Sequence, residues 1–222
     1  MYRVGIVGLG RIGFEFEDSH FIAYRNNPNT QIVFLYDCNL EKARWRGYGS
    51  ITDEVDIVSI CTPPETHCEL VLQFASRTKA IWCEKPIAMN LDEADKMIEV
   101  CKENNTMLQI NHQRRWMRPK FKFSRGILNS GSHAFDLVNF LFKDPSIVDF
   151  EYIDTDEYIF EFNLTHPEEP LLPKALDHLV WCLETGNQSI SSGEDGREAL
   201  RQCLEFEELR GKNERRNSIR VI

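Results

Sequence analysis

The sequence predicts an α/β protein whose first half is a doubly wound parallel sheet. Two observations carry this prediction: short apolar runs alternate with helical patterns, and several of the runs are almost unbroken in apolar character. Unbroken apolar strands are typical of parallel sheets buried on both faces, and repeated β-α-β units close such a sheet by right-handed crossovers. The expected strands are residues 2–7, 31–36, 55–60, 80–83 and 107–110.

Helical patterns fill the intervals between these strands. The clearest begins after Asn90, a good N-cap, with Glu93 at the capping-box position and apolar residues at 94, 97, 98 and 101 on one face. A second helix is expected at about residues 65–76. The alternation of the two element types extends through the first half of the chain.

The pattern changes after about Pro119. Residues 158–164 alternate apolar and polar side chains, which predicts a half-buried strand of an antiparallel sheet. Two amphipathic helices follow, one over about 173–185 that ends at Gly186, the other from near Ser192. The second half is therefore expected to be α+β.

We accordingly predict two domains. Residues 1–118 form the parallel α/β domain, and residues 119–222 form a C-terminal α+β domain with a reduced antiparallel sheet, for substrate binding and oligomerisation. A chain of 222 residues with 42% hydrophobic and 27% charged residues has the composition of a folded protein rather than a disordered one.

The charge and the cysteines limit the classes of partner. Acidic residues outnumber basic ones by 35 to 26, and this balance disfavours nucleic acid or an anionic membrane as the main partner. The N-terminus lacks the features of a secretory signal, and no apolar run is long enough to span a membrane. The cysteines lack metal-ligand spacing, so we expect no metal and a cytoplasmic protein with reduced thiols. They are residues 38, 61, 68, 83, 101, 182 and 203.

A glycine-rich segment, residues 8–13 (GLGRIG), follows the first strand directly. In this setting Gly8 allows a tight turn, Gly10 lets the backbone approach a pyrophosphate, and Gly13 permits close packing of the next helix. The segment thus predicts a dinucleotide-binding Rossmann domain. The alternative is a glycine-rich turn with a purely structural role.

Asp37 ends the second strand. An acidic residue at this place can accept hydrogen bonds from both hydroxyls of the adenosine ribose, and it repels the additional phosphate of NADP. NAD is therefore the expected cofactor and NADP the less favoured one. The alternative role of Asp37 is to cap a helix at about residues 39–43.

Every other polar or Gly/Pro cluster of this half also falls at the carboxyl end of a strand, where open α/β sheets bind their ligands. A structural role alone would scatter such residues over both edges of the sheet. The residues assigned to the cofactor site are Gly8, Gly10, Arg11, Ile12, Gly13, Asp37, Thr62, Pro63, Pro64, His67, Glu84, Lys85 and Pro86.

Taken in order, these motifs resemble the glucose–fructose oxidoreductase/inositol dehydrogenase (Gfo/Idh/MocA) family. The matching segments are GLGRIG, Asp37, CTPPETH, CEKP and NHQRRW, followed by a His-x-x-Asp segment and an SGEDG segment at residues 192–196. The resemblance covers nearly the whole chain. It implies an NAD-dependent dehydrogenase acting on a hydroxyl or carbonyl of a sugar, cyclitol or related polyol, assembled as a homodimer or homotetramer.

The resemblance also implies catalytic residues. Lys85 is the lysine beside the nicotinamide, where a cation can hydrogen-bond a developing alkoxide, and His133 is the acid/base residue. Asn129 stands where many members of the family carry an aspartate, so it can orient a substrate but cannot carry a proton. Asp136 is expected to orient His133. Read singly, Lys85 could be a surface lysine and His133 a structural histidine.

Substrate and reaction type stay open at the level of sequence. His112, Arg114 and Arg115 are candidate substrate contacts, and with Arg118 the two arginines favour an anionic substrate unless they are solvated or paired. One alternative function is a non-catalytic NAD(H)-binding sensor or scaffold. Another is a lyase or glycosidase that uses NAD for transient oxidation.

The second half is shorter than the resemblance implies. We expect the natural protein to be longer, with internal segments absent from this sequence. The expected places are after Phe16, around residues 45–50, between Phe123 and Asn129, and within about 144–172.

Overall fold

The structure is a computed structural model, and its description is confined to part of the chain. The described residues are 1–39, 41–42, 54–116, 120–124, 149–153, 160–163 and 170–217. The chain divides into two compact units, Met1–Arg115 with Leu172–Ile222 as the first and Trp116–Leu171 as the second.

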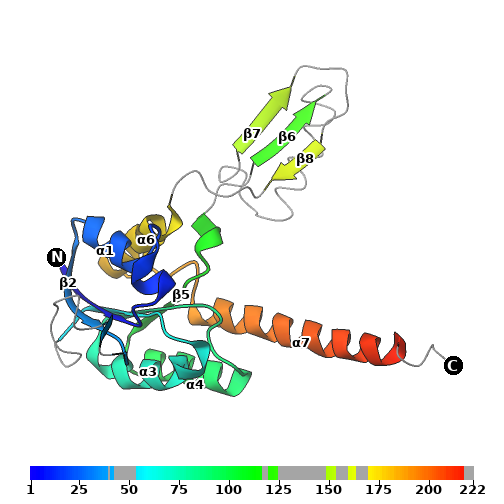
Figure 1. Cartoon of the computed structure of the whole chain (residues 1–222). Coiled ribbons are helices and arrows are strands. Elements are labelled where there is room, and N and C mark those ends of the chain that lie inside the picture. Colours follow the sequence, from blue (N-terminus) through cyan, green and yellow to red (C-terminus); the bar gives the residue numbers. More distant parts are fainter. Residues whose placement is uncertain are drawn as a thin grey trace. The chain divides into compact units, whose positions relative to one another are not determined.

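The first unit is built on a five-stranded parallel sheet of order β2-β1-β3-β4-β5 (Figure 1). Its strands are β1 (Tyr2–Val7), β2 (Thr30–Tyr36), β3 (Ile57–Ile60), β4 (Ala80–Cys83) and β5 (Met107–Ile110). The five strands predicted from the apolar runs are confirmed, with small shifts at some of the amino ends. The strand order reverses between β1 and β3, which is the topological switch point of a doubly wound sheet.

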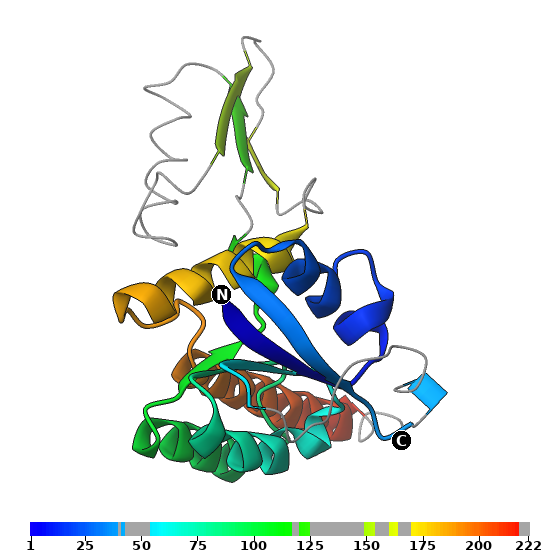
Figure 2. The ribbon, with the colours of Figure 1, turned by 90° about the vertical axis from the view of Figure 1, so that its left-hand side faces the viewer.

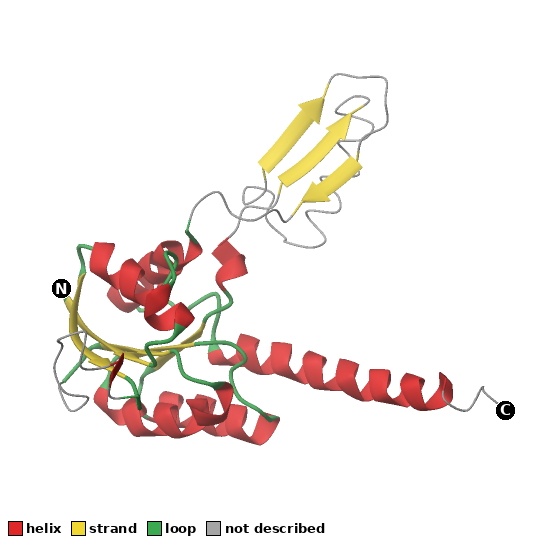
Figure 3. Ribbon diagram, viewed as in Figure 1, coloured by secondary structure: helices red, strands yellow, loops and turns green. Residues whose placement is uncertain are grey.

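Helices cover both faces of this sheet (Figures 2 and 3). One face carries α3 (His67–Phe74), α4 (Leu91–Glu103) and α7 (Gly193–Asn217), and the other carries α1 (His20–Asn26) and α6 (Leu171–Thr185). The predicted Asn90 cap of α4 is confirmed, because its side chain accepts the Glu93 N–H at 2.9 Å. The predicted helix at 65–76 is shorter as an α-helix because a 3-10 turn adjoins it at each end, Pro64–Thr66 and Ala75–Arg77.

The segment after the glycines differs from the helix that the sequence predicted. Arg11–Glu15 forms a single π-helical turn, and the α-helix starts only at His20. Ser19 caps that helix by accepting the Ile22 N–H. Residues 14–18 (FEFED) alternate aromatic and acidic side chains, a pattern that does not place one apolar stripe along a helix.

The two C-terminal helices belong to the first unit, whereas the sequence assigned them to a second domain. Buried apolar side chains form one stripe of α6, and the Gln109 side chain of β5 donates to the Ala175 carbonyl of that helix. The first turn of α7 packs close to β5, since a Cβ on Gly196 would lie 2.7 Å from the Ile110 side chain. The domain boundary after residue 118 remains a prediction. The compact units divide the chain differently, after Arg115 and again after Leu171.

The second unit contains a three-stranded sheet of order β7-β6-β8. Its strands are β6 (Lys120–Ser124), β7 (Asp149–Ile153) and β8 (Phe160–Asn163). The strand predicted at 158–164 is confirmed as β8, which pairs antiparallel with β6. The sheet is mixed rather than antiparallel throughout, because β6 and β7 run parallel.

Two further findings concern the cysteines and the helices. All seven cysteines are free, as expected for reduced thiols. Among the helices in the described ranges, none combines the length and the apolar character that a membrane crossing needs.

Candidate functional site at the carboxyl edge of the sheet

The strand register aligns the carboxyl ends of the five strands. Val7 pairs with Tyr36 and with Ile60, Ile60 with Cys83, and Cys83 with Ile110. The residues that directly follow these ends therefore form one row across the edge of the sheet. The row consists of Asp37, Gly8, Cys61, Glu84 and Asn111. Parallel pairing thus brings the sequence-predicted cofactor clusters together.

The three glycines of the first loop occupy different surroundings. Gly8 has a φ of +94°, and a Cβ there would lie 2.6 Å from the Cys61 backbone. A Cβ on Gly13 would lie 2.0 Å from the Gly8 carbonyl oxygen, so only glycine allows this approach. A Cβ on Gly10 would meet nothing within 4 Å. The loop therefore needs glycine internally at two positions and faces open space at the third.

Arg11 and Ile12 follow Gly10 in the π-helical turn. The Arg11 guanidinium lies over the Phe16 ring, 4.5 Å from its centroid. Backbone N–H groups in the first turn of a helix have no partner within the helix, and such groups favour an anion. The predicted contact of both residues with the cofactor stays a prediction.

Asp37 lies beside this loop and holds it. Its Oδ2 accepts the Leu9 N–H at 2.8 Å, and its Oδ1 accepts the Asn39 N–H at 2.8 Å. The carboxylate therefore has a structural role that links β2 to the glycine loop. Each carboxylate oxygen can accept a second hydrogen bond, so a ribose hydroxyl remains a chemically suitable partner.

Thr62, Pro63 and Pro64 follow β3, and the His67 side chain contacts this loop. The imidazole is fully buried; its Nε2 lies 2.9 Å from the Thr62 carbonyl oxygen and its Nδ1 lies 3.0 Å from the Pro86 carbonyl oxygen. The ring thus connects the loop after β3 to the loop after β4. Sequence reasoning assigned His67 to the cofactor site, and that role stays a prediction; within the fold its contacts connect the two loops.

Glu84 is the best-connected side chain of the row. It is 7% exposed, and its Oε1 accepts from His20 Nε2 at 3.0 Å and from Asn111 Nδ2 at 2.5 Å. Its Oε2 accepts the Lys85 N–H at 3.3 Å. Burial by itself raises the pKa of this carboxyl, but the hydrogen bonds from His20 and Asn111 and the nearby charge of Lys85 bring the pKa below its ordinary value.

A buried polar chain continues from Glu84 into the sheet. Because the carboxylate can only accept, His20 donates from Nε2, and its Nδ1 lies 2.9 Å from Ser59 Oγ. Ser59 in turn lies 2.8 Å from the Tyr24 hydroxyl. Every member of this chain is buried. His20, Ser59 and Tyr24 were not singled out from the sequence, since nothing in their spacing reveals that side chains of α1 reach Ser59 and Glu84.

Lys85 and Pro86 differ from Glu84 in being exposed, and the peptide bond between them is cis. The Lys85 ammonium forms no hydrogen bond or ion pair with any residue in the described part of the chain. A buried carboxylate therefore fixes the backbone of this loop, while the neighbouring ammonium group projects from it with its donors uncommitted.

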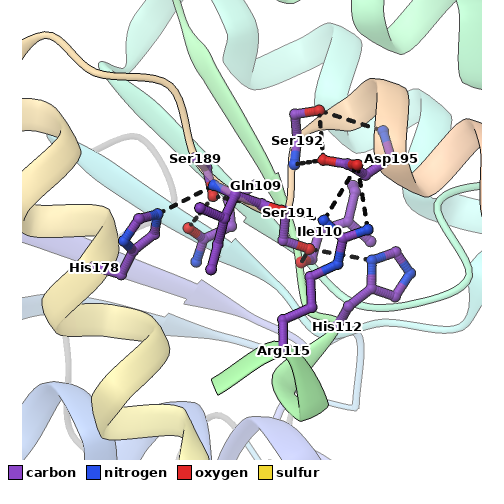
Figure 4. Close-up of polar contacts among 10 residues, drawn as sticks. Gln109, Ile110, His112, Arg115, His178, Ser189, Ser191, Ser192 and Asp195 are labelled. Carbon is purple, nitrogen blue, oxygen red and sulfur yellow. Dashed lines mark hydrogen bonds and ion pairs between the residues drawn. The ribbon is translucent and has the colours of Figure 1, made fainter. Parts of the chain in front are cut away.

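His112 and Arg115 follow β5 and are held by the segment that leads into α7 (Figure 4). His112 Nδ1 lies 3.1 Å from Ser191 Oγ. The Arg115 guanidinium donates to the Ile190 carbonyl and to Asp195, whose carboxylate also accepts the Ser192 N–H. Arg115 is thus paired within the fold, which weakens the expectation that it binds an anionic substrate. Ser189 and Ser191 were missed because their partners lie about 80 positions earlier.

Some predicted site residues cannot be placed. Asn129, His133, Asp136 and Arg118 lie outside the described residues, as does the side chain of Arg114. Their predicted roles stay predictions.

A hollow of about 560 Å³ lies at the opposite edge of the sheet, near the amino ends of the strands, where Arg3, Asp56 and Lys79 are among its lining residues. Asp56 is already bound there by the Arg3 N–H and the Lys79 ammonium at 2.8 and 2.9 Å. The hollow lies at the sheet edge opposite the glycine loop and Lys85. The carboxyl edge therefore remains the candidate site.

Comparison with known proteins identifies this arrangement. Residues 2–112, which contain the whole parallel sheet and the row at its carboxyl edge, match the family described as "Oxidoreductase family, NAD-binding Rossmann fold" (GFO_IDH_MocA). The chain belongs to this family. The Rossmann fold and the family resemblance predicted from the motifs are thereby confirmed, and NAD is the cofactor that the family's fold binds.

Individual relatives share the fold but differ in activity. Myo-inositol 2-dehydrogenase from Thermotoga maritima is 29% identical over 167 residues, covering 71% of this chain and 50% of the relative. A 2,7-anhydro-N-acetylneuraminate hydratase from Mediterraneibacter gnavus is 28% identical over 124 residues, covering 55% and 32%. A solved structure of UDP-N-acetylglucosamine 3-dehydrogenase from Acidithiobacillus ferrooxidans superposes with a TM-score of 0.64 at 16% identity, covering 92% and 96%. The chain spans about half the length of the curated relatives it matches.

Proposed function

We propose that this oxidoreductase is an NAD-dependent dehydrogenase that acts on a hydroxyl or carbonyl of a sugar, cyclitol or related polyol. The observation that carries the proposal is the Lys85 ammonium, which has no partner among the described residues and projects from a fixed loop at the same sheet edge as the open glycine loop. The relation to myo-inositol 2-dehydrogenase supports the substrate class.

The described residues fit a dinucleotide. The open space at Gly10 suits the close approach of a pyrophosphate to the backbone. Asp37 suits the ribose hydroxyls of NAD and opposes the 2′-phosphate of NADP. Bound NAD would supply the hydride acceptor for the alcohol.

Lys85 is proposed to donate a hydrogen bond to the substrate oxygen on which negative charge develops. His133, by the family resemblance, is proposed as the residue that takes the proton, with Asp136 as its orienting partner and Asn129 as a neutral contact. The arrangement as a homodimer or homotetramer is likewise a proposal from the resemblance.

The test is a panel of sugars, cyclitols and polyols with NAD, followed by the absorbance of reduced nicotinamide. With the best substrate, Lys85→Ala should lose most of kcat while NADH affinity changes little, because the ammonium acts on the transition state. Lys96→Ala is the matched control, since Lys96 is an exposed lysine on α4 away from the row. Unchanged turnover in Lys85→Ala would remove Lys85 from the mechanism.

The hydratase relative favours one alternative, in which NAD oxidises the substrate only transiently. Such an enzyme converts substrate without net accumulation of NADH. Quantifying product and NADH in one reaction separates the two cases, because a dehydrogenase yields them in equal amounts. Tight NADH binding without conversion of any compound would instead indicate a sensor or scaffold.

A further inference from the structure

His112 lies at the carboxyl end of β5, beside the loop that carries Lys85. The preceding residue ties the two loops together, because the Asn111 N–H donates to the Cys83 carbonyl at 2.8 Å and its side chain donates to Glu84. The charges of Lys85 and Glu84 both act on the His112 imidazole. The imidazole therefore directly follows the row and is partly buried, on a loop that Asn111 ties to the loop of Lys85.

The hydrogen bonds around Ser191 determine which imidazole nitrogen bears the proton. Ser191 Oγ lies 2.7 Å from the Ile110 carbonyl oxygen, and a carbonyl can only accept, so the hydroxyl hydrogen points to Ile110. The same oxygen can then only accept at its contact of 3.1 Å with His112 Nδ1. The Nδ1 of His112 consequently carries a proton, and Nε2 of the neutral ring carries a lone pair.

The Ser191 hydroxyl is itself held in place. Ser191 is fully buried, and its N–H donates to Ser189 Oγ at 3.1 Å. The Ser189 hydroxyl donates to Gln109 Oε1 at 2.7 Å (Figure 4). Ser191 also extends the sheet, because its carbonyl accepts the Ile110 N–H at 2.8 Å. The hydroxyl that contacts His112 therefore has both neighbours and orientation fixed by β5.

The second nitrogen of His112 is available. Its Nε2 has no hydrogen-bond partner among the residues that the structure describes. Partial burial, with the nearby charges of Arg115 and Lys85, lowers the pKa of this imidazole below its ordinary value and outweighs the opposite effect of Asp195 and Glu84. The ring is accordingly neutral near pH 7, and a lone pair rather than an N–H is present at Nε2.

We propose that Ser191 is a positioning residue that fixes His112 in the Nδ1–H tautomer, so that Nε2 accepts a hydrogen bond from a substrate hydroxyl beside Lys85. The acceptor role rests on the proposed polyol dehydrogenase function. The tautomer itself does not, since it follows from contacts within the fold. The pair would give the site one donor, Lys85, and one acceptor, His112, for neighbouring oxygens of a polyol.

The tautomer is tested by two-dimensional ¹H–¹⁵N NMR of the imidazole groups in the full chain, with and without NADH. The His112 signals, assigned by their loss in His112→Asn, should show an unprotonated Nε2 and a protonated Nδ1. Ser191→Ala should convert this signal to a mixture of tautomers, while Ser192→Ala, which removes the neighbouring hydroxyl, should leave it unchanged. A protonated Nε2 in the unmodified protein would overturn the proposal.

The acceptor role is tested with the best substrate from the polyol panel. His112→Asn keeps a donor toward Ser191 but has no acceptor at the position of Nε2, whereas His112→Gln can place an amide oxygen there. We expect kcat/KM to fall roughly tenfold in His112→Asn, with part of this loss recovered in His112→Gln and NADH affinity unchanged in both. Equal rates in all three proteins would refute the acceptor role. Absence of turnover in the unmodified protein would refute the proposed function, while the NMR result would still decide the tautomer.

Discussion

At the scale of single residues, replacing either of two glycines of one loop by alanine should have opposite effects on stability and on NADH binding. Gly10→Ala should leave the thermal midpoint nearly unchanged, because its Cβ meets nothing and its φ of −77° suits alanine, yet it should weaken NADH binding where the pyrophosphate is expected. Gly13→Ala should lower stability instead, since its Cβ overlaps the Gly8 carbonyl. Thermal unfolding and NADH titration of both variants check this pair. Undiminished NADH affinity in Gly10→Ala would place the cofactor elsewhere.

Asp37 combines a structural hydrogen bond with the expected choice between the two cofactors. Asp37→Asn keeps an oxygen for the Leu9 N–H but removes the charge, so the preference for NAD over NADP should narrow. Hydrogen bonds to a charged acceptor contribute about 1.5–3 kcal/mol, so we expect the ratio of dissociation constants to shrink roughly ten- to hundredfold. Isothermal titration with both nucleotides measures the ratio. Equal affinities in the unmodified protein would contradict the assignment.

At the scale of elements, Glu84 connects α1, β4 and β5 through three donors. Glu84→Gln cannot satisfy them all, because its amide N–H groups must face either Lys85 N–H or the donors of His20 and Asn111. Each unsatisfied buried group costs about 1–3 kcal/mol, so urea unfolding should show a loss of that order. Glu99→Gln on the exposed face of α4 is the control and should change little.

The same carboxyl predicts how stability depends on pH. Its pKa in the folded protein is lower than the ordinary value of 4.5, so its stabilising contribution is present above pH 4.5 and is lost as the pH falls through the lowered value. The difference in unfolding free energy between the unmodified protein and Glu84→Gln should therefore decrease below pH 4.5. A difference that stays constant down to acid pH would show that the carboxylate is not stabilised by its neighbours.

Strands were predictable from the sequence, whereas the partners of the helices were not. A run such as 80–83 is apolar on both faces, which leaves little choice but a buried parallel strand. The stripe of α6 indicates that one face is buried but not which sheet buries it, and so this helix was assigned to the other domain. The π-helical turn after Gly10 was missed because the glycine pattern was taken to imply a full helix.

For the site, the sequence predicted which edge carries the chemistry but not the contacts of each side chain. The glycine spacing and the loop after β4 needed only the rule that parallel strands end together. The role of Glu84 depends on His20, 64 positions away, and that of His112 depends on Ser191, 79 positions away. Such pairs leave no periodic pattern, so only the folded chain reveals that Glu84 and His67 position the loops.

At the scale of the whole molecule, the packing of α6 bears on the predicted domain boundary. Leu172, Leu176 and Leu179 are fully buried, and each buried leucine stabilises by about 1.5–3 kcal/mol. Their sum is comparable to the total stability of a typical domain. A fragment of residues 1–118 should therefore fail to fold cooperatively, while residues 1–115 joined to 172–217 by a short linker should fold. Circular dichroism and thermal unfolding of both fragments check this, and a cooperatively folded 1–118 fragment would contradict it.

The pairing of Ser191 with β5 also has a consequence for biosynthesis. β5 is the outer strand of the sheet, and its free side is covered by the short bridge from Gln109 to Ser192 and the hydrogen bond from Ile110 to Ser191. Ile110 and Ser191 lie 81 positions apart in the chain. Strand β5 therefore leaves the ribosome well before residues 191 and 192, which cover its free side, are translated. Through that interval the nascent chain presents an unpaired strand that can join a neighbouring polypeptide. We therefore expect the yield of native protein to depend on how quickly translation reaches residue 192.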